Sequence, residues 1–332
     1  MFYFSPYFYA RFDSMTLFKA WLSAARLRTL PLSVSGVIVG SSLGWGVVYE
    51  QTIQQALEKL PTVGFRHAGV WESPLFWLAI LTTIGFQVLS NFANDYGDGI
   101  KGTDANRKGE KRMVASGMIS AKQMKRGMII TAVLTLFIAS LLIFIAFGNE
   151  QFLLAFLFFN LTLASILAAV KYTVGKSAYG YSGFGDVFVF LFFGLLSVLG
   201  SYFLFTKNLE WDLLLPAASI GFFSTAVLNL NNMRDIENDS AVGKNTLVVK
   251  MGSMRAKKYH YLLLCFGMIC ALGYTFLNFQ DPVRFLYAIA FVPLVFNIVS
   301  VARNREPSRL DSELKKVALS TFAFAILFGW LH

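Results

Sequence analysis

The sequence predicts an all-α protein that crosses a membrane nine times, with its N-terminus in the cytoplasm. Hydrophobic residues make up 56% of the 332 positions and charged residues only 14%, whereas a soluble domain carries about 25% charge. The mean hydropathy of +0.57 also excludes an intrinsically disordered chain. The third observation is that nearly all basic residues fall on one side of the predicted membrane.

Spanning segments are predicted where a charge-free stretch approaches the roughly 20 residues that a helix needs to cross the hydrocarbon. Because lipid offers the backbone no hydrogen-bond partner, these stretches must be helices. The last stretch is short but extends back over Lys315 and Lys316, whose aliphatic stems can reach the interface. The predicted spans are Thr29–Tyr49, Ser73–Asn94, Gly127–Asn149, Gln151–Val170, Val187–Thr206, Leu213–Met233, Tyr259–Gln280, Phe285–Ala302 and Val317–Leu331.

The net charge of +10 follows mainly from membrane topology, and no nucleic-acid partner is predicted. Of the 29 Lys and Arg residues, only Lys59, Arg66, Lys207 and Arg284 fall in loops on the sparsely charged side. Basic loops remain in the cytoplasm. This asymmetry therefore predicts a cytoplasmic N-terminus and a C-terminus on the outside.

One membrane-embedded domain is predicted over residues 1–332, with residues 1–15 as an interfacial or upstream extension. Two cytoplasmic loops, residues 95–126 and 234–258, are long and carry charges of both signs. Small residues spaced by four in the first span predict close packing against another helix. These residues are Gly36, Gly40 and Gly44.

Two acidic motifs stand at the cytoplasmic ends of the second and sixth predicted spans. Each contains three polar residues at helical spacing, which places side-chain oxygens on one helix face. The triplets are Asn91, Asp95 and Asp98 at offsets 0, 4 and 7, and Asn231, Asp235 and Asp239 at offsets 0, 4 and 8. Because both stand at the same depth on the same side, we expect them to face each other.

Carboxylates grouped at a membrane boundary repel one another, and ionisable groups at this depth are functional by default. Oxygen-only ligands favour Mg²⁺ over zinc. Because Mg²⁺ usually bridges one or two carboxylates to substrate phosphates, the remaining ligand is predicted to be a phosphate or diphosphate. The predicted metal ligands are Asp95, Asp98, Asp235 and Asp239, and these four with Lys101 form the predicted catalytic set.

Basic residues beside both motifs fit an anionic substrate. Arg26 stands at the mouth of the first span, Lys101 and Arg112 follow the first motif, and Lys244 follows the second. Such side chains hold diphosphate oxygens and stabilise a departing diphosphate. Each of them also satisfies the positive-inside rule, which is a purely topological explanation.

The motifs resemble those of the intramembrane aromatic prenyltransferases of the UbiA superfamily. The resemblance rests on residues 91–104, residues 231–239, Gly243-Lys244 and Arg26-Leu27-Arg28, and it extends over about residues 20–330. It implies nine helices around a central cavity, Mg²⁺ between the two motifs, a polyprenyl diphosphate donor and an aromatic acceptor. Such an enzyme lies in the lipid bilayer of a bacterial plasma membrane with its active site facing the cytoplasm.

Within the superfamily, the motifs resemble most closely the branch that acts on a naphthoate acid in menaquinone biosynthesis. That branch transfers a polyprenyl group to 1,4-dihydroxy-2-naphthoate with loss of CO₂ and diphosphate, giving demethylmenaquinone. The resemblance and the basic residues together predict a substrate-binding set. It consists of Asn91, Asn94, Arg26, Arg112, Lys171, Tyr172, Asn231, Arg234 and Lys244.

The sequence departs from the superfamily pattern at several positions. Gly102 stands at the fourth acidic position, and Asp104 lies two residues later. Relatives often carry an arginine where this chain has Ser182. If that arginine contacts substrate, Lys171 or Lys176 must replace it here.

Two alternative functions remain open at the level of sequence. One is a prenyltransferase for another aromatic acceptor, namely 4-hydroxybenzoate, homogentisate, or a haem or chlorophyll precursor, because the metal half of the site would be identical. The other is a transporter of a cation or an anionic lipid. Transporters place ion sites near the midplane, whereas these acidic residues cluster at one boundary.

Overall fold

The computed structural model describes residues 17–59, 68–102, 112–175 and 178–332, and the regular structure in these ranges is entirely helical. Nine helical segments of the described chain are long and apolar enough to cross a membrane, as predicted. The helices are α2 (Leu30–Lys59), α3 (Pro74–Lys101), α4 (Ala121–Phe147), α5 (Phe152–Lys171), α6 (Gly185–Val189), α7 (Ser197–Thr206), α8 (Leu214–Arg234), α9 (Ile236–Ala241), α10 (Leu247–Met251), α11 (Ser253–Asn278), α12 (Val292–Arg303) and α13 (Leu310–Leu331).

Several predicted boundaries were wrong because polar helical turns resemble loops in sequence. Helix α2 continues to Lys59, through a polar segment rich in Glu, Gln and Ala, which are good helix formers. The predicted loop 95–126 begins too early, since α3 continues to Lys101 and α4 starts at Ala121. The predicted loop 234–258 contains α9, α10 and the start of α11.

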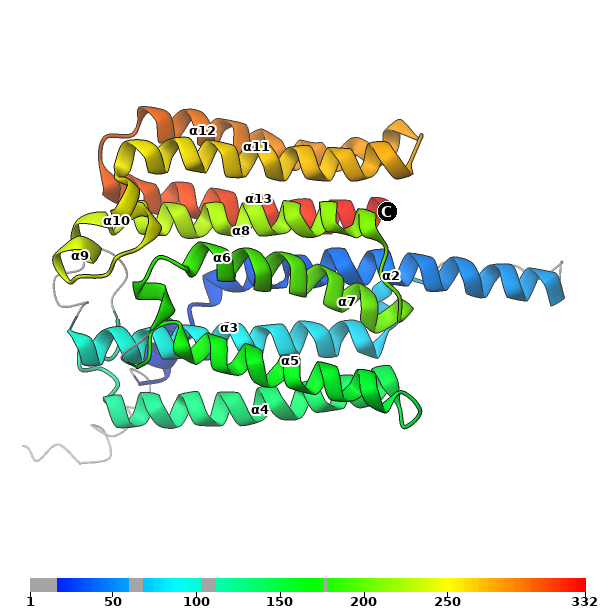
Figure 1. Ribbon diagram of the computed structural model, residues 1–332, viewed down its shortest axis with the longest axis horizontal. Helices are drawn as coiled ribbons and strands as arrows, with labels where there is room; N and C mark the ends of the chain where they lie inside the picture. The colour runs from blue at the N-terminus through cyan, green and yellow to red at the C-terminus, as the bar shows by residue number, and fades with distance from the viewer. Residues whose placement is uncertain (1–16, 60–67, 103–111, 176–177) are drawn as a thin grey trace, which may run out of the picture.

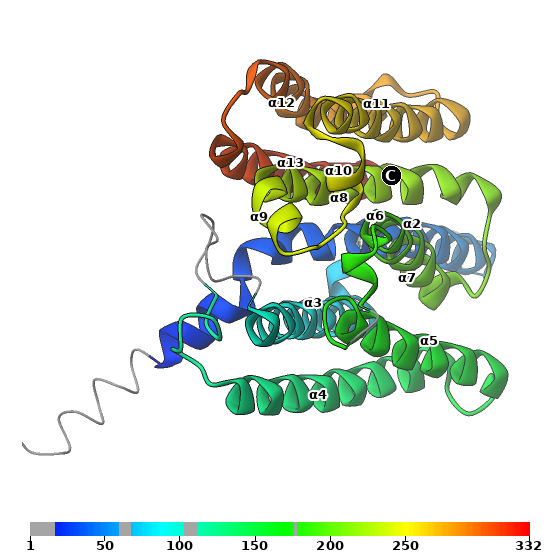
Figure 2. The same ribbon diagram turned by 60° about the vertical axis from the view of Figure 1, so that its left-hand side comes forward.

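The spans form one bundle with two flanks and a centre (Figures 1 and 2). Helices α3, α4 and α5 contact one another on one flank, and α11 and α12 form the other, where α11 packs on α8 and α12 on α13. Helix α2 lies in the centre, in contact with α3, α7 and α13. The short helices α9 and α10 lie at the same end of the bundle as the start of α4 (Figure 1).

The glycine stripe of α2 packs closely against α7, as predicted. A Cβ on Gly40 would lie 2.1 Å from the carbonyl oxygen of Val198. A Cβ on Gly36 would lie 2.6 Å from the carbonyl oxygen of Phe193. Only glycine allows the two backbones this approach, which holds α2 and α7 together beside the cavity described below.

Apolar clusters hold the bundle together on both sides of its centre. The largest joins α8, α11, α12 and α13 and includes the fully buried rings of Phe223, Tyr287, Phe324 and Phe328. A smaller cluster around Val37, Leu142 and Leu204 lies at the end of the bundle away from the acidic motifs. Burial of such side chains is worth about 1.5–3 kcal/mol each in water. In lipid, close packing itself contributes most of this stabilisation.

Some predictions lie outside the described residues. These are the extension at residues 1–15 and the positions of Asp104 and Lys176.

Candidate active site

A cavity of about 390 Å³ lies between α2, α3, α4, α5, α7 and α8. At one end it is lined by Arg26, Asn94, Asp98, Asn231 and Lys244 among other polar residues. At the other end the lining is apolar. It includes Val37, Ala79, Leu142, Ile143 and Leu204.

Helix α3 gives the length of this cavity, because it contributes lining residues from Ala79 to Asp98. At 1.5 Å per residue these positions are roughly 28 Å apart along the axis. The cavity therefore runs through most of the membrane thickness, from a charged mouth to an apolar end. This shape fits an elongated molecule with an anionic head and a hydrocarbon tail.

The first motif lies on the last turns of α3, which ends where Gly102 adopts φ 71°. Asn91, Asn94 and Asp98 line the cavity. Asn91 donates hydrogen bonds to the carbonyl oxygen of Ala25 (2.8 Å) and to the hydroxyl of Thr29 (3.2 Å). These hydrogen bonds fix the segment that connects the helical residues 17–25 with α2. Arg26 and Arg28, in this segment, line the cavity.

Gly97, inside the motif, allows the chain after α5 to approach α3. A Cβ at this position would lie 2.8 Å from the carbonyl oxygen of Thr173. The same carbonyl accepts a hydrogen bond from Lys101 Nζ at 2.9 Å, and the Thr173 hydroxyl donates to Asn94 Oδ1 at 3.1 Å. Lys101 and Asn94 are therefore fixed from the α5 side of the site.

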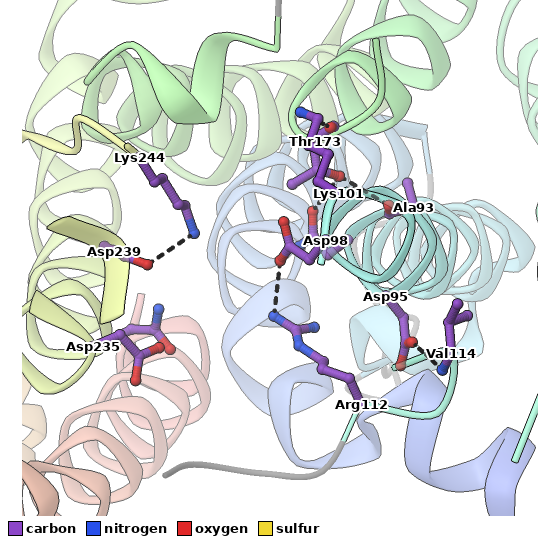
Figure 3. Close-up of polar contacts among 12 residues, drawn as sticks. Ala93, Asp95, Asp98, Lys101, Arg112, Val114, Thr173, Asp235, Asp239 and Lys244 are labelled. Carbon is purple, nitrogen blue, oxygen red and sulfur yellow. Dashed lines mark hydrogen bonds and ion pairs between the residues drawn. The ribbon is translucent and has the colours of Figure 1, made fainter. Parts of the chain in front are cut away.

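Asp95 does not share the face of Asn91 and Asp98, contrary to the predicted grouping. Its two carboxylate oxygens accept hydrogen bonds from the backbone N–H groups of Met113 (2.9 Å) and Val114 (2.8 Å). Figure 3 shows Asp95 directed toward Val114 and away from Asp239. Asp95 stands about one helical turn after Asn91, but it does not line the cavity. The cavity-facing residues of this motif are Asn91, Asn94 and Asp98, at offsets 0, 3 and 7.

Asp98 is held from two sides at the cavity mouth, where it is 3% exposed. The Tyr181 hydroxyl donates to Oδ1 at 2.7 Å, and Arg112 donates to Oδ2 at 3.3 Å. Arg112 belongs to the loop that Asp95 anchors. The two acids of the first motif therefore have different tasks: one fixes the loop, and the other faces the cavity.

The second motif is organised by the guanidinium of Arg234, the last residue of α8. Arg234 donates to both oxygens of Asp235 at 2.9 Å, to Asn231 Oδ1 at 2.8 Å and to Asp311 Oδ1 at 2.8 Å. Arg28 lies 3.8 Å from the same oxygen of Asp311. Asp235 is thus neutralised by its neighbour, and Asn231 is oriented toward the cavity that it lines.

Asp239, on α9, faces the mouth from the side opposite Asp98 (Figure 3). It is 4% exposed, and Lys244 Nζ lies 3.6 Å from its Oδ1. Figure 3 shows Lys244 extending between the two aspartates. The structure therefore brings Asp98, which lines the cavity, and Asp239, which contacts the cavity-lining Lys244, to one opening, as expected from their common depth.

The other predicted substrate-binding residues divide into two groups. Tyr172 lines the cavity near its mouth, and burial raises the pKa of its hydroxyl well above the ordinary value. Lys171, at the end of α5, is exposed and is not among the residues that line the cavity, so the structure does not place it in the candidate site. Lys171 therefore does not replace the arginine found in relatives.

Sequence reasoning missed Asp311 as a site residue, and it considered Tyr181 only as one of several tyrosines near the predicted mouth, not as a partner of an acidic motif. Tyr181 lies among turn-forming residues between two spans. Asp311 opens the first turn of α13, where an acidic residue is ordinary. Their contacts with Asp98, Arg234 and Arg28 join residues 77 to 283 positions apart, which no local pattern reveals.

The residues at the mouth fit Mg²⁺ through the chemistry of their donors. Asp98, Asp239, Asn94 and Asn231 offer oxygen atoms, which hard cations prefer. Among the described residues, no three His, Cys, Asp or Glu side chains converge closely enough to enclose a metal ion by themselves. That pattern suits Mg²⁺, which keeps waters and completes its coordination with substrate phosphates.

A helical membrane bundle whose cavity runs from a charged mouth to an apolar end has the architecture of an intramembrane enzyme. The chain belongs to the UbiA prenyltransferase family, whose sequence pattern matches residues 62–325.

Relatives cover nearly the whole chain. It is 37% identical over 318 residues to a 1,4-dihydroxy-2-naphthoate octaprenyltransferase of Haemophilus influenzae, covering 94% of each chain. It is also 37% identical over 315 residues to the protein of the same name from Escherichia coli, covering 93% of this chain and 94% of that one.

The fold matches that of solved family members. A UbiA homologue from Archaeoglobus fulgidus bound to GPP and Mg²⁺ aligns with a TM-score of 0.60 and 16% identity. The match covers 93% of this chain and 99% of that one. At this identity the likeness concerns the fold.

Proposed function

We propose that this protein transfers a polyprenyl group from a polyprenyl diphosphate to 1,4-dihydroxy-2-naphthoate. Diphosphate and CO₂ are released, and the product is demethylmenaquinone in its reduced, quinol form. The observation that carries the proposal is the shape of the cavity. Its charged mouth matches the diphosphate of the donor, and its apolar end matches the polyprenyl tail. The near-full-length relatives of this name support the choice of acceptor.

At the mouth, Lys244, Lys101 and Arg112 supply the positive charge that binds the diphosphate oxygens and stabilises them as the allylic C–O bond breaks. Mg²⁺ would be held by Asp98 and Asp239 with amide oxygens of the flanking asparagines. When bound, it would neutralise charge on the leaving diphosphate. We assign Asp95 and Asp235 to orienting the neighbouring loop and Arg234, because both carboxylates are bound by those groups.

The apolar part of the cavity accommodates the isoprenoid tail and excludes water from the reacting carbon. Its walls include Phe158, Phe192 and Phe193. Arg26 and Arg28 line the mouth on the α2 side, and we assign them to anionic groups of the two substrates. A new C–C bond forms at the ring carbon that carries the carboxylate. CO₂ leaves from that carbon and restores the aromatic ring, so no separate base is required.

Membranes containing Asp98→Asn or Asp239→Asn should lose prenyl transfer by about a hundredfold or more, since each change removes a carboxylate that would hold Mg²⁺ beside the diphosphate. The assay follows labelled prenyl diphosphate into a quinol of the expected mass. Asp212→Asn, the same change at the opposite end of the bundle, serves as the matched control. Full activity in both mouth variants would refute the proposal.

The same preparation discriminates the alternatives. Wild-type protein supplied with 4-hydroxybenzoate, homogentisate and the naphthoate acid should form product only with the last. Transfer to another acceptor with none to the naphthoate would refute the proposed acceptor but remain consistent with the proposed metal site. Substrate movement across vesicles without release of pyrophosphate would instead favour transport.

A further inference from the structure

Tyr181 lies in the segment between α5 and α6, which belongs to neither acidic motif, yet it contacts Asp98 of the first motif and the chain that follows the second. Its hydroxyl donates a hydrogen bond to Asp98 Oδ1 at 2.7 Å. Its backbone carbonyl accepts a hydrogen bond from the N–H of Asn245 at 3.0 Å, in the chain that follows α9. One residue therefore connects the end of α3 with the loop of the second motif.

The ring of Tyr181 also lies near both lysines of the site. Lys101 Nζ is 3.8 Å from the ring centroid, and Lys244 Nζ is 5.5 Å from it. Both distances fall within the range of cation–π attraction. Because the two ammonium groups repel each other, a shared aromatic ring is a means of keeping both at the mouth.

The position of Tyr181 is fixed by its neighbours. The N–H of Gly180 donates to the carbonyl of Tyr172 at 3.0 Å, and Lys250 Nζ donates to the carbonyl of Ser182 at 2.7 Å. The segment is thus tied to the end of α5 on one side and to α10 on the other. The contacts of Tyr181 with Asp98 and the lysines follow from this fixed backbone.

We propose that Tyr181 is a positioning residue that couples the two acidic motifs. Its hydroxyl, together with Arg112, fixes the rotation of the Asp98 carboxylate, and its ring holds Lys101 and Lys244 around the diphosphate. The inference rests on the proposed function. Groups that orient metal ligands from behind are worth about 10- to 100-fold in metal affinity or activity.

Two substitutions separate the two contacts of Tyr181. Tyr181→Phe removes the hydroxyl and keeps the ring, so the Mg²⁺ concentration for half-maximal transfer should rise about tenfold. The KM for prenyl diphosphate at saturating Mg²⁺ should stay within about twofold. Tyr181→Leu removes the ring as well and should raise both values. Tyr96→Phe is the matched control and should resemble wild type. Tyr96 lies on the turn of α3 that carries Asp98, but it packs against an apolar cluster.

A second measurement does not depend on turnover. Mn²⁺ binding in the presence of inorganic pyrophosphate, followed by electron paramagnetic resonance of the free ion, should weaken about tenfold in Tyr181→Phe and remain unchanged in Tyr96→Phe. Thermal unfolding of each purified variant verifies that it is folded. If a folded Tyr181→Phe protein has the same Mg²⁺ dependence and Mn²⁺ affinity as wild type, the inference about Tyr181 is overturned while the proposed function stands. Absence of metal-dependent transfer in the wild type would overturn the proposed function itself.

Discussion

Asp95 and Asp98 stand three positions apart on one helix, yet they contact different parts of the protein. Asp95 receives two backbone N–H groups from the loop after α3, whereas Asp98 faces the cavity and accepts from Tyr181 and Arg112. Because Asp95 anchors the loop that carries Arg112, it acts on the site through its neighbour. Residue type alone does not distinguish these two tasks.

Replacing Asp95 by Ala should destabilise the protein by about 2–3 kcal/mol, because two backbone N–H groups lose their acceptors. The released loop should also be cut by trypsin after Arg112 faster than in wild type. Thermal unfolding in detergent and timed proteolysis measure the two effects. Glu150→Ala, an exposed acid in the turn between α4 and α5, is the control. Unchanged melting and cleavage would show that the two hydrogen bonds contribute nothing.

At the scale of elements, the contact between α2 and α7 sets the width of the bundle beside the cavity. Both helices contribute lining residues, including Ser33 and Val37 on α2 and Ser201 and Leu204 on α7. Gly40 lies between these residues and faces backbone on α7. Backbone yields less readily than a flexible side chain, so this position has little tolerance for added volume.

Gly40→Ala should therefore destabilise the protein by about 1–3 kcal/mol, the usual cost of overpacking. It should also lower prenyl transfer, because α2 and α7 must separate along the cavity wall. Gly46→Ala in the same helix is the matched control, since its Cβ would make only an ordinary contact, 3.5 Å from the backbone oxygen of His332. Equal melting temperatures for the two variants would contradict this account.

At the scale of the whole molecule, the charge asymmetry and the alternating spans give the bundle a direction. The acidic motifs and most basic residues lie at the end that carries α9 and α10 (Figure 1). Lys59 at the end of α2, Lys207 directly after α7 and Arg284 before α12 lie at the other end. The positive-inside rule therefore predicts that the mouth of the cavity faces the cytoplasm.

Cysteine labelling tests this orientation. In a background with Cys265 and Cys270 replaced by Ser, Asn208→Cys should react with an impermeant maleimide in intact cells. Ala241→Cys, on α9, should react only after permeabilisation, because both positions are exposed but lie at opposite ends. The reverse pattern would invert the topology and place the active site outside.

Stability should also depend on pH through His332 at the outer end of the bundle. Burial, together with the nearby Arg284 cation, lowers the pKa of His332 to about 4 from its ordinary value near 6.5. Between these values the unfolded chain binds a proton that the folded protein does not. The free energy of unfolding should therefore fall as the pH drops from about 6.5 toward 4.

His332→Phe should reduce this dependence, because the ring stacked on Phe328 is kept and the titrating group is lost. Melting temperatures at pH 7 and pH 5 measure the difference for variant and wild type. An equal loss in both would assign the acid sensitivity to other groups.

Much of the architecture could be predicted from the sequence because a bilayer imposes local rules. Length and hydropathy fix the number of spans without any knowledge of contacts, and the placement of the 29 basic residues predicts their direction. The two acidic motifs likewise identify the end of the bundle where chemistry occurs. Errors at α2, α3 and α9 arose where polar helical turns extend beyond the apolar stretch.

The sequence by itself thus determined the number of spans, the family resemblance and the residue types of the site. Only the tertiary structure decided that Asp98 faces the cavity, that Arg234 neutralises Asp235, and that Tyr181 contacts Asp98. The physical reason is range. Hydropathy and charge act along the chain, whereas side-chain orientation at the mouth depends on hydrogen bonds between residues up to 83 positions apart.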